Sequence, residues 1–249
     1  MKNKIWFLAL TALSLASCRS NLSLAHADTQ KNITIAASIP EDGASKTVIE
    51  PYKKSMEAQM NSKISHTSFE LTKTGDNSNL GNLLADYTLQ GAKEWAAKNN
   101  IPQIDGAVIN IGGIRSTIGK GDILLKHIFE VMPFENEVVI VKMTGKQMQG
   151  LFDYYLQSKK NNPVSGFVIE TDKDKLVRAL VGGKNLDENK TYYIATSDYL
   201  ALGGDNMKFF SKGKLISTGI KLRDLFVEKF RANPEIVAPT DIRLIFNKK

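Results

Sequence analysis

The sequence predicts an α+β domain built on a mixed β-sheet with packed helices. Segments with the residue spacing of helices and segments with the character of strands interleave irregularly along the chain. Most of the expected strands are joined by short turns, as at Gly182-Gly183, and no internal repeat or low-complexity segment is present. This combination is typical of a single α+β domain with a mixed sheet.

Two amphipathic helices are predicted in the first half of the chain. Apolar side chains recur at helical spacing over 47–60, where Pro51 bends the helix or limits it to the residues that follow. The second pattern is clearer, because apolar residues from Leu80 to Trp95 lie three or four positions apart. A polar residue within 77–79 can cap this second helix.

The remaining elements follow from the same two kinds of pattern. Residues 137–143 alternate as a strand does, and residues 40–43 have the composition of a turn. Further strands are expected over 33–39, 105–110, 166–171, 176–181, 191–196 and 242–246, with helices over 145–158 and 222–231.

The N-terminus has the pattern of an export signal. Lys2 and Lys4 precede an apolar run over 5–16 that is too short to span a bilayer as a helix. Leu15-Ala16-Ser17-Cys18 then resembles a bacterial lipobox, which predicts a lipoprotein signal peptide over 1–17 and acylation of Cys18. Cleavage after Ala25-His26-Ala27 is the alternative and would give a soluble secreted protein.

We therefore expect an exported, membrane-anchored lipoprotein that faces the periplasm or the cell surface. Its polar tether would cover residues 18–32, and its folded domain residues 33–249. Because Cys18 is the only cysteine, the folded part has no disulfide, and its stability must come from a hydrophobic core. No later stretch is apolar enough to span a membrane.

The composition fits a globular core and argues against nucleic-acid binding. About 200 residues follow the leader, enough to bury one core, and the 42% hydrophobic content is ordinary. The formal net charge of +7 becomes +5 without Lys2 and Lys4. The other lysines are scattered and form no basic stripe with interleaved aromatics, so no nucleic-acid partner is expected.

One motif is the best single indication of a ligand site, Asn110-Ile111-Gly112-Gly113-Ile114-Arg115. It follows the apolar residues 106–109, so its glycine pair stands where a strand ends. Glycines there let backbone amides approach a ligand closely. The Arg115 guanidinium is a permanently charged fork suited to phosphate or to sugar oxygens. Alone, the motif also fits a tight turn with a solvated arginine.

Other loops carry side chains that suit a nucleoside. Phe134 precedes the strand over 137–143 and Tyr199 follows the strand over 191–196, and two such aromatics can hold a flat base between them. Asp205 can accept both hydroxyl protons of a ribose. Taken singly, core burial of Phe134 and a turn or cap at Asp205 remain open. Together the loops predict a small-molecule pocket, with Arg115, Gly112 and Gly113 holding further oxygens and Asn110 or Asn136 at the base edge.

The order of these segments resembles the C-terminal domain of the 5'-nucleotidase/UDP-sugar hydrolase family. The resemblance extends, in family order and spacing, from about residue 45 to the C-terminus. The matching pieces are Asn79-Leu80-Gly81-Asn82-Leu83-Leu84-Ala85-Asp86, Asn110-Ile111-Gly112-Gly113-Ile114-Arg115, Gly121-Asp122-Ile123, Pro133-Phe134-Glu135-Asn136, Met143-Thr144-Gly145-Lys146, Ser165-Gly166-Phe167 and Asp198-Tyr199-Leu200-Ala201-Leu202-Gly203-Gly204-Asp205.

The resemblance implies a domain that binds the nucleoside part of a substrate. It implies that Phe134 and Tyr199 stack on the base and that Asp205 holds the ribose, while Arg115 and Asn110 assist. The full set of expected substrate-binding residues is Asn110, Gly112, Gly113, Arg115, Phe134, Asn136, Gly166, Tyr199 and Asp205.

The sequence also departs from the family pattern. Ile111 replaces one glycine of the family's triplet, and Glu135 replaces the glycine of its Pro-Phe-Gly-Asn segment, which adds a charge near the stacking ring. Lys73 and Thr74 stand where the family often places arginines toward the phosphate. We therefore expect recognition of a nucleoside or a modified nucleotide to matter more than phosphate binding.

No catalytic or metal-binding residue is predicted in this chain. The family cleaves phosphate esters with an N-terminal two-metal domain, whereas His26, His66 and His127 stand in none of that domain's metal-binding contexts. The resemblance thus implies no cofactor here and a separately encoded metallophosphoesterase subunit as partner in nucleotide catabolism. Two alternatives are a self-sufficient hydrolase with a metal held by Asp and Glu, and a surface lipoprotein that keeps the fold without binding.

Overall fold

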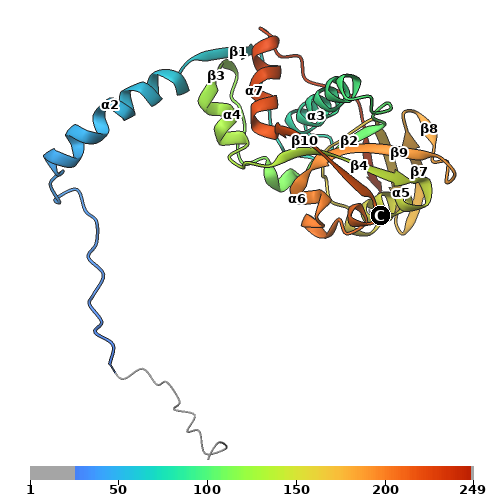
Figure 1. Cartoon of the computed structure of the whole chain (residues 1–249), viewed down its shortest axis with the longest axis horizontal. Helices are drawn as coiled ribbons and strands as arrows, with labels where there is room; N and C mark the ends of the chain where they lie inside the picture. Colours follow the sequence, from blue (N-terminus) through green and yellow to red (C-terminus); the bar gives the residue numbers. More distant parts are fainter. Residues whose placement is uncertain (1–25, 248–249) are drawn as a thin grey trace, which may run out of the picture. The chain divides into compact units, whose positions relative to one another are not determined.

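The structure, a computed structural model, describes residues 26–247. The predicted signal peptide and the lipidation of Cys18 therefore lie outside the described residues. By its internal contacts the chain divides into two units, Met1–Val48 and Ile49–Lys249. The sheets and the candidate site all belong to the second unit (Figure 1).

The prediction for residues 33–39 is wrong, since they form no strand. Ile33 and Ile35 are exposed, and the segment pairs with no other strand, which a stable strand requires. The predicted helix over 47–60 is confirmed as α2 (Gly43–Met60), which begins earlier and runs through Pro51. No side chain of α2 is buried.

The central sheet is mixed, as predicted. In spatial order its strands are β10 (Lys214–Lys221), β4 (Glu137–Thr144), β9 (Thr191–Ser197), β2 (Gly106–Val108) and β5 (Val164–Ser165). The strand β4 pairs antiparallel with β10 and with β9, whereas β2 pairs parallel with β9.

Two smaller sheets complete the strand pattern. One pairs β1 (Lys63–Thr67) with β3 (Gly121–Leu124), and neither strand was expected from the sequence. The order of the other sheet is β11 (Leu244–Asn247), β6 (Phe167–Asp172), β7 (Lys175–Val181) and β8 (Lys184–Asn185). It confirms the predicted strands over 166–171, 176–181 and 242–246, and β11 pairs parallel with β6.

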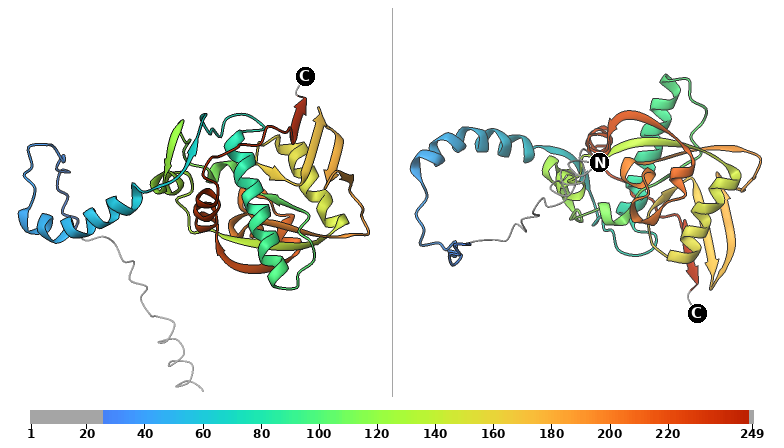
Figure 2. Two further views of the ribbon diagram at one scale, coloured as in Figure 1. Left: turned by 90° about the horizontal axis from the view of Figure 1, so that it is seen from above. Right: turned by 60° about the horizontal axis from the view of Figure 1, so that its bottom comes forward.

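Helices cover both faces of the central sheet. Because successive side chains of a strand point to opposite faces, Val138 and Ile140 of β4 join one hydrophobic cluster and Val139 and Val141 join a second. The first cluster includes the buried faces of α3 (Asn79–Lys98) and α7 (Leu222–Ala232), and the second that of α5 (Gly145–Ser158). Figure 2 shows the same helices and the sheet from two further sides.

Two of these helices begin with a side-chain cap. Ser78 caps α3, because its side chain accepts a hydrogen bond from the Gly81 amide at 3.2 Å. Thr144 and Gln147 form a reciprocal capping box at the start of α5. The short helix α4 (Leu125–Val131) was not predicted. None of the helices within residues 26–247 has the length and hydrophobicity of a membrane-spanning segment.

A buried arginine ties the C-terminal segment to the helices. The Arg243 side chain is only 7% exposed, and its two terminal nitrogens each donate to Asp86 of α3 at 2.8 Å. Its Nε donates to Asp241 at 2.7 Å, and Nη1 also donates to the Val164 carbonyl at 2.8 Å. The guanidinium therefore joins α3, β5 and the chain before β11 at one point.

Candidate functional site

Three loops meet at one edge of the central sheet and enclose a cavity of about 450 Å³. The edge is shared because β2 and β9 are parallel, so both end there, while the antiparallel β4 begins there. The loops are those after β2, before β4 and after β9. The cavity is lined by Asn110, Gly112, Arg115, Phe134, Asn136, Tyr199 and Asp205.

The loop after β2 is a 3₁₀ turn, η1 (Ile111–Gly113), that directs one amide outward. The Gly113 amide donates to the Asn110 carbonyl at 3.0 Å, and Gly113 is buried and does not line the cavity. The Ile111 amide donates to Asn162 Oδ1 at 2.9 Å. Within residues 26–247 the Gly112 amide has no hydrogen-bond partner, so it is the one amide of this turn available to a ligand.

The side chain of Ile111 does not enter the cavity. It is half-buried and packs against the hydrophobic cluster that includes α3. The replacement of the family glycine by Ile111 therefore leaves the cavity open. A side chain two positions later would be crowded, because a Cβ at Gly113 would lie 3.0 Å from Asn110 Oδ1.

Arg115 reaches the cavity with most of its hydrogen-bonding capacity unused. Its Nη1 donates to the Gly112 carbonyl at 3.0 Å, which holds the guanidinium beside the turn. No acidic side chain in the described part of the chain forms an ion pair with it. A guanidinium has five N–H donors, so an anionic or oxygen-rich ligand would find several of them free.

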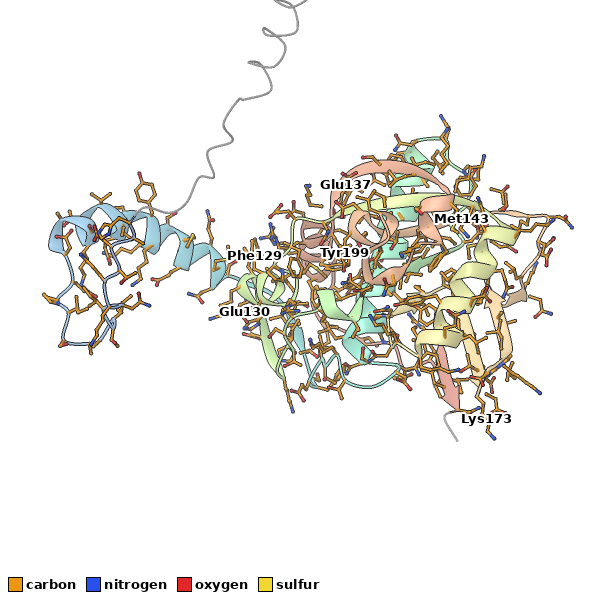
Figure 3. The ribbon with its side chains drawn as sticks, turned by 90° about the horizontal axis from the view of Figure 1, so that it is seen from below. Phe129, Glu130, Glu137, Met143, Lys173 and Tyr199 are labelled. Atoms are coloured by element: carbon orange, nitrogen blue, oxygen red, sulfur yellow. The ribbon has the colours of Figure 1, made fainter. Side chains whose placement is uncertain are left out.

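The two aromatic rings at the cavity are exposed rather than part of the core. Phe134 is 43% exposed and Tyr199, labelled in Figure 3, is 44% exposed. Core burial, the alternative for Phe134, is therefore wrong. Large apolar rings that stay exposed on two separate loops around a cavity are suited to a flat ligand.

The charge of Glu135 is held away from the cavity. Its carboxylate pairs with Arg223 at the start of α7, and the Arg223 guanidinium lies 4.5 Å from the centre of the Phe129 ring. Arg223 also donates to the Pro133 carbonyl at 3.3 Å, and Lys221 donates to the Glu135 carbonyl at 3.1 Å. These contacts fix the loop that carries the first aromatic ring, and Glu135 does not line the cavity.

The loop after β9 is fixed by a hydrogen bond between two cavity residues. The Tyr199 hydroxyl donates to Asp205 Oδ1 at 3.1 Å and accepts from the Asp205 amide at 3.2 Å. Asp205 has a left-handed backbone, with φ of 51°. Gly204 is required for close approach, since a Cβ there would lie 2.5 Å from Tyr199 Cζ. The carboxylate is thus oriented before any ligand arrives.

Gly166 is the predicted site residue that lies apart from the others. It occupies the turn between β5 and β6 with φ of +78°, and a Cβ there would lie 2.6 Å from the Asp105 carbonyl oxygen. Its glycine is explained by this close approach, and it does not line the cavity. The structure thus brings together seven of the nine predicted residues and leaves out Gly113 and Gly166.

Three supporting residues were not predicted from the sequence: Asn162, Arg223 and Asp198. Asn162 is fully buried and holds the turn after β2, and Arg223 holds the loop before β4. Asp198 accepts a hydrogen bond from Asn136 Nδ2 at 2.8 Å. The Asn-Pro dipeptide at 162–163 is typical of a turn, and Asp198 opens a segment that resembles the family, whereas Arg223 gives no local signal.

Each histidine within the described range has a hydrogen-bond partner. His26 Nε2 lies 2.8 Å from Asp28, His66 Nδ1 lies 2.7 Å from Glu235, and His127 Nδ1 accepts from the Leu124 amide at 3.1 Å. In that same range no group of three or more His, Cys, Asp or Glu residues is placed to hold a metal ion.

Curated relatives are 5'-nucleotidases or related proteins. The chain is 29% identical over 234 residues to the 5'-nucleotidase of Vibrio vulnificus, covering 83% of this chain and 39% of that protein. It is 30% identical over 209 residues to Protein UshA of Escherichia coli, covering 79% of this chain and 35% of that protein. The chain thus spans about two fifths of the length of the curated relatives it matches.

Solved structures share the fold. The 5'-nucleotidase precursor from Thermus thermophilus matches with a TM-score of 0.68 at 24% identity, over 84% of this chain and 44% of that one. The NAD nucleotidase of Haemophilus influenzae matches with a TM-score of 0.62 at 19% identity, over 83% of this chain and 41% of that one.

The family model described as "5'-nucleotidase, C-terminal domain" matches residues 58–212, which is more than half of the chain. This range contains β2, β4 and β9 and every residue that lines the cavity. The resemblance seen in the sequence is therefore confirmed, and the chain belongs to the 5'-nucleotidase C-terminal domain family.

Proposed function

We propose that the cavity binds a nucleoside or nucleotide and that this domain serves nucleotide catabolism. The observation that carries the proposal is the convergence of Phe134, Tyr199, Asp205 and Arg115 on one cavity. Its volume of about 450 Å³ lies within the usual range for small-molecule sites, about 300–1,000 Å³. Relatives named as 5'-nucleotidases and a structural neighbour named as an NAD nucleotidase support a nucleotide-type ligand.

Each group has a role that matches its chemistry. Phe134 and Tyr199 stack on the base, each ring contributing about 1–3 kcal/mol. Asp205 accepts hydrogen bonds from the ribose hydroxyls, because Tyr199 occupies only one of its two oxygens in the described structure. Arg115 and the Gly112 amide hold phosphate or other oxygens.

The positions of Ile111 and Glu135 support binding over a fold that has lost its pocket. The replacement of two family glycines, by Ile111 and Glu135, is the sequence feature that favours a non-binding lipoprotein. Ile111 packs against the core, and Glu135 pairs with Arg223, so neither replacement fills the cavity.

We also propose that the protein is exported and anchored through Cys18, and that a separate metallophosphoesterase subunit supplies the hydrolytic step. Positioning and charge stabilisation of a phosphate ester by two metal ions would be the task of that subunit. The domain described here would hold the nucleoside so that the ester bond meets the metals. The alternative is a chain that hydrolyses nucleotides unaided.

Calorimetry with adenosine, AMP and UDP-glucose tests the binding proposal on the full chain. A ligand at about one hundred times its Kd should stabilise the fold by about 2.7 kcal/mol in a melting experiment. Tyr52→Ala removes an exposed aromatic ring that does not line the cavity, so this control variant should bind each ligand as the wild type does. The absence of a shift with all three ligands would overturn the proposal.

Phosphate release tests the proposed division of labour. The purified chain, freed of contaminating phosphatases, should release no phosphate from AMP with or without divalent metals. Arg115→Met is the informative variant, since a chain active by itself through this cavity would lose activity with it. Metal-dependent release by the wild-type chain alone would establish the self-sufficient alternative instead.

A further inference from the structure

We infer that Asp198 fixes the orientation of the Asn136 amide, and that the cavity therefore selects a base with an N–H donor at the edge facing Asn136. This inference rests on the proposed function, because it concerns which bases that same cavity accepts. Asp198 would act as a positioning residue that sets specificity through its neighbour.

The two residues are brought together by the register of the central sheet. Asn136 precedes β4, and Asp198 begins α6 (Asp198–Ala201) directly after β9. Because Val138 pairs with Ser197 across these antiparallel strands, the residues just beyond the pair also lie opposite one another. Asn136 Nδ2 donates to Asp198 Oδ1 at 2.8 Å.

The chemistry of the pair permits only one orientation of the amide. An ionised carboxylate accepts hydrogen bonds and donates none, whereas a carboxamide has a donating NH₂ end and an accepting oxygen end. Asn136 must therefore turn its nitrogen toward Asp198 and its oxygen the other way. A flipped amide would place two acceptors against each other and lose the hydrogen bond.

Both partners are held by backbone contacts. Asp198 Oδ1 also accepts from the Tyr199 amide at 2.7 Å, which orients the carboxylate. The Asn136 carbonyl accepts from the Leu222 amide at 2.8 Å, which fixes the main chain under the side chain. The amide orientation is thus set by the folded protein and not by the ligand.

The fixed orientation of the Asn136 amide limits which base edges the cavity can bind. Asn136 lines the cavity, and across residues 26–247 its Oδ1 accepts no hydrogen bond. A base edge that presents an N–H group would satisfy this oxygen, whereas an edge with only ring nitrogens would meet it acceptor to acceptor. Asn110, the other amide at the cavity, has no side-chain hydrogen bond in the described chain that fixes its orientation, so it imposes no such choice.

Adenosine and purine riboside make a matched pair of probes. They share the ribose and the purine ring, but the base of purine riboside carries no N–H group. With the wild-type chain, calorimetry should give a Kd for adenosine about 3- to 10-fold lower than for purine riboside, the effect of one additional hydrogen bond in a partly open site.

Asp198→Ala tests the positioning role. An alanine at 198 cannot accept the hydrogen bond from Asn136 Nδ2, so the Asn136 amide is free to take either orientation, and the preference for adenosine should fall to less than about twofold. Asn136→Ala should remove the preference altogether. Asp187→Ala is the matched control, because Asp187 is exposed and does not line the cavity, and it should keep the full preference.

The ratio of the two Kd values for one variant does not depend on how much of that variant is folded. Equal wild-type affinities for the two nucleosides would overturn this inference alone. Full preference in Asp198→Ala would overturn the role of Asp198. Failure of both nucleosides to bind the wild-type chain would overturn the proposed function and this inference with it.

Discussion

Arg243 and Arg115 occupy two regions of this domain that use the same side chain in opposite ways. Arg243 is buried, and its guanidinium nitrogens donate hydrogen bonds to the carboxylates of Asp86 and Asp241 and to the Val164 carbonyl. Arg115 is exposed and donates only to the Gly112 carbonyl of its own loop. One guanidinium is fully used by the fold, and the other has donors left for a ligand.

The same contrast holds for the loops around the two arginines. The C-terminal segment is bound tightly to α3 and β5 by one charged group. The cavity loops are held instead by residues behind them, such as Asn162 and Arg223, so their ligand-facing groups stay unpaired. Partners, rather than residue type, therefore distinguish a structural from a binding arginine.

Arg243→Met gives the largest expected effect. The variant leaves Asp86 and Asp241 without their cation, and because these carboxylates are 35% and 62% exposed the expected cost is about 2–3 kcal/mol, in the range of hydrogen bonds to a charged group. Urea unfolding should show a lower midpoint. Arg115→Met is the matched control and should change the free energy of unfolding by less than about 0.5 kcal/mol. Equal stabilities of the two variants would contradict the contrast.

Phe134→Ala tests the aromatic part of the cavity. Because this ring is exposed, its loss should leave the free energy of unfolding almost unchanged while weakening adenosine binding by about 1–3 kcal/mol, or about 5- to 150-fold. Calorimetry beside a urea titration separates the two effects. A large loss of stability with unchanged affinity would show that the ring serves the core.

Arg115→Met should also separate phosphate from nucleoside. A charge-assisted hydrogen bond contributes about 1.5–3 kcal/mol when buried and less in an open site, so the affinity for AMP should fall about tenfold. Adenosine lacks the phosphate and should bind the variant nearly as well as the wild type. A parallel loss for both ligands would assign Arg115 to the sugar or to the loop.

The smallest expected effect is on the pH dependence of stability, and it comes from the ion pair between Arg243 and Asp241. Hydrogen bonds from Arg243 lower the pKa of Asp241 below its usual value. A lowered folded-state pKa gives stability that is present above the unfolded pKa, near 3.9, and is lost as the pH falls through the folded pKa. In Arg243→Met the free energy of unfolding, measured by urea titration from about pH 5 to pH 2, should therefore fall less steeply with pH than in the wild type.

Strongly periodic elements were predictable from the sequence, and elements defined by a distant partner were not. The helices α3 and α5 show helical apolar spacing and caps, so the local sequence determines them. Residues 33–39 have the β-branched composition of a strand but no partner, while β10 pairs with β4 although half of its residues are polar. Strand pairing is a contact between distant segments, and local composition does not reveal it.

The residues of the cavity likewise fall into a predictable and an unpredictable set. Its ligand-facing groups were identified because glycines, aromatics and charges at strand ends are typical of binding loops. The supporting contacts join residues 51, 62 and 88 positions apart, namely Ile111 with Asn162, Asn136 with Asp198, and Glu135 with Arg223. Such separations carry no periodic signal, so only the folded chain reveals them.

The left-handed backbone of Asp205 has a consequence for the speed of binding. A residue other than glycine in this conformation costs about 1–3 kcal/mol, and the folded chain meets that cost through the hydrogen bonds between Tyr199 and Asp205. The loop therefore has no ordering step left to complete when a ligand arrives. We expect association in one kinetic phase, governed by diffusion and orientation rather than by a slow rearrangement of the loop.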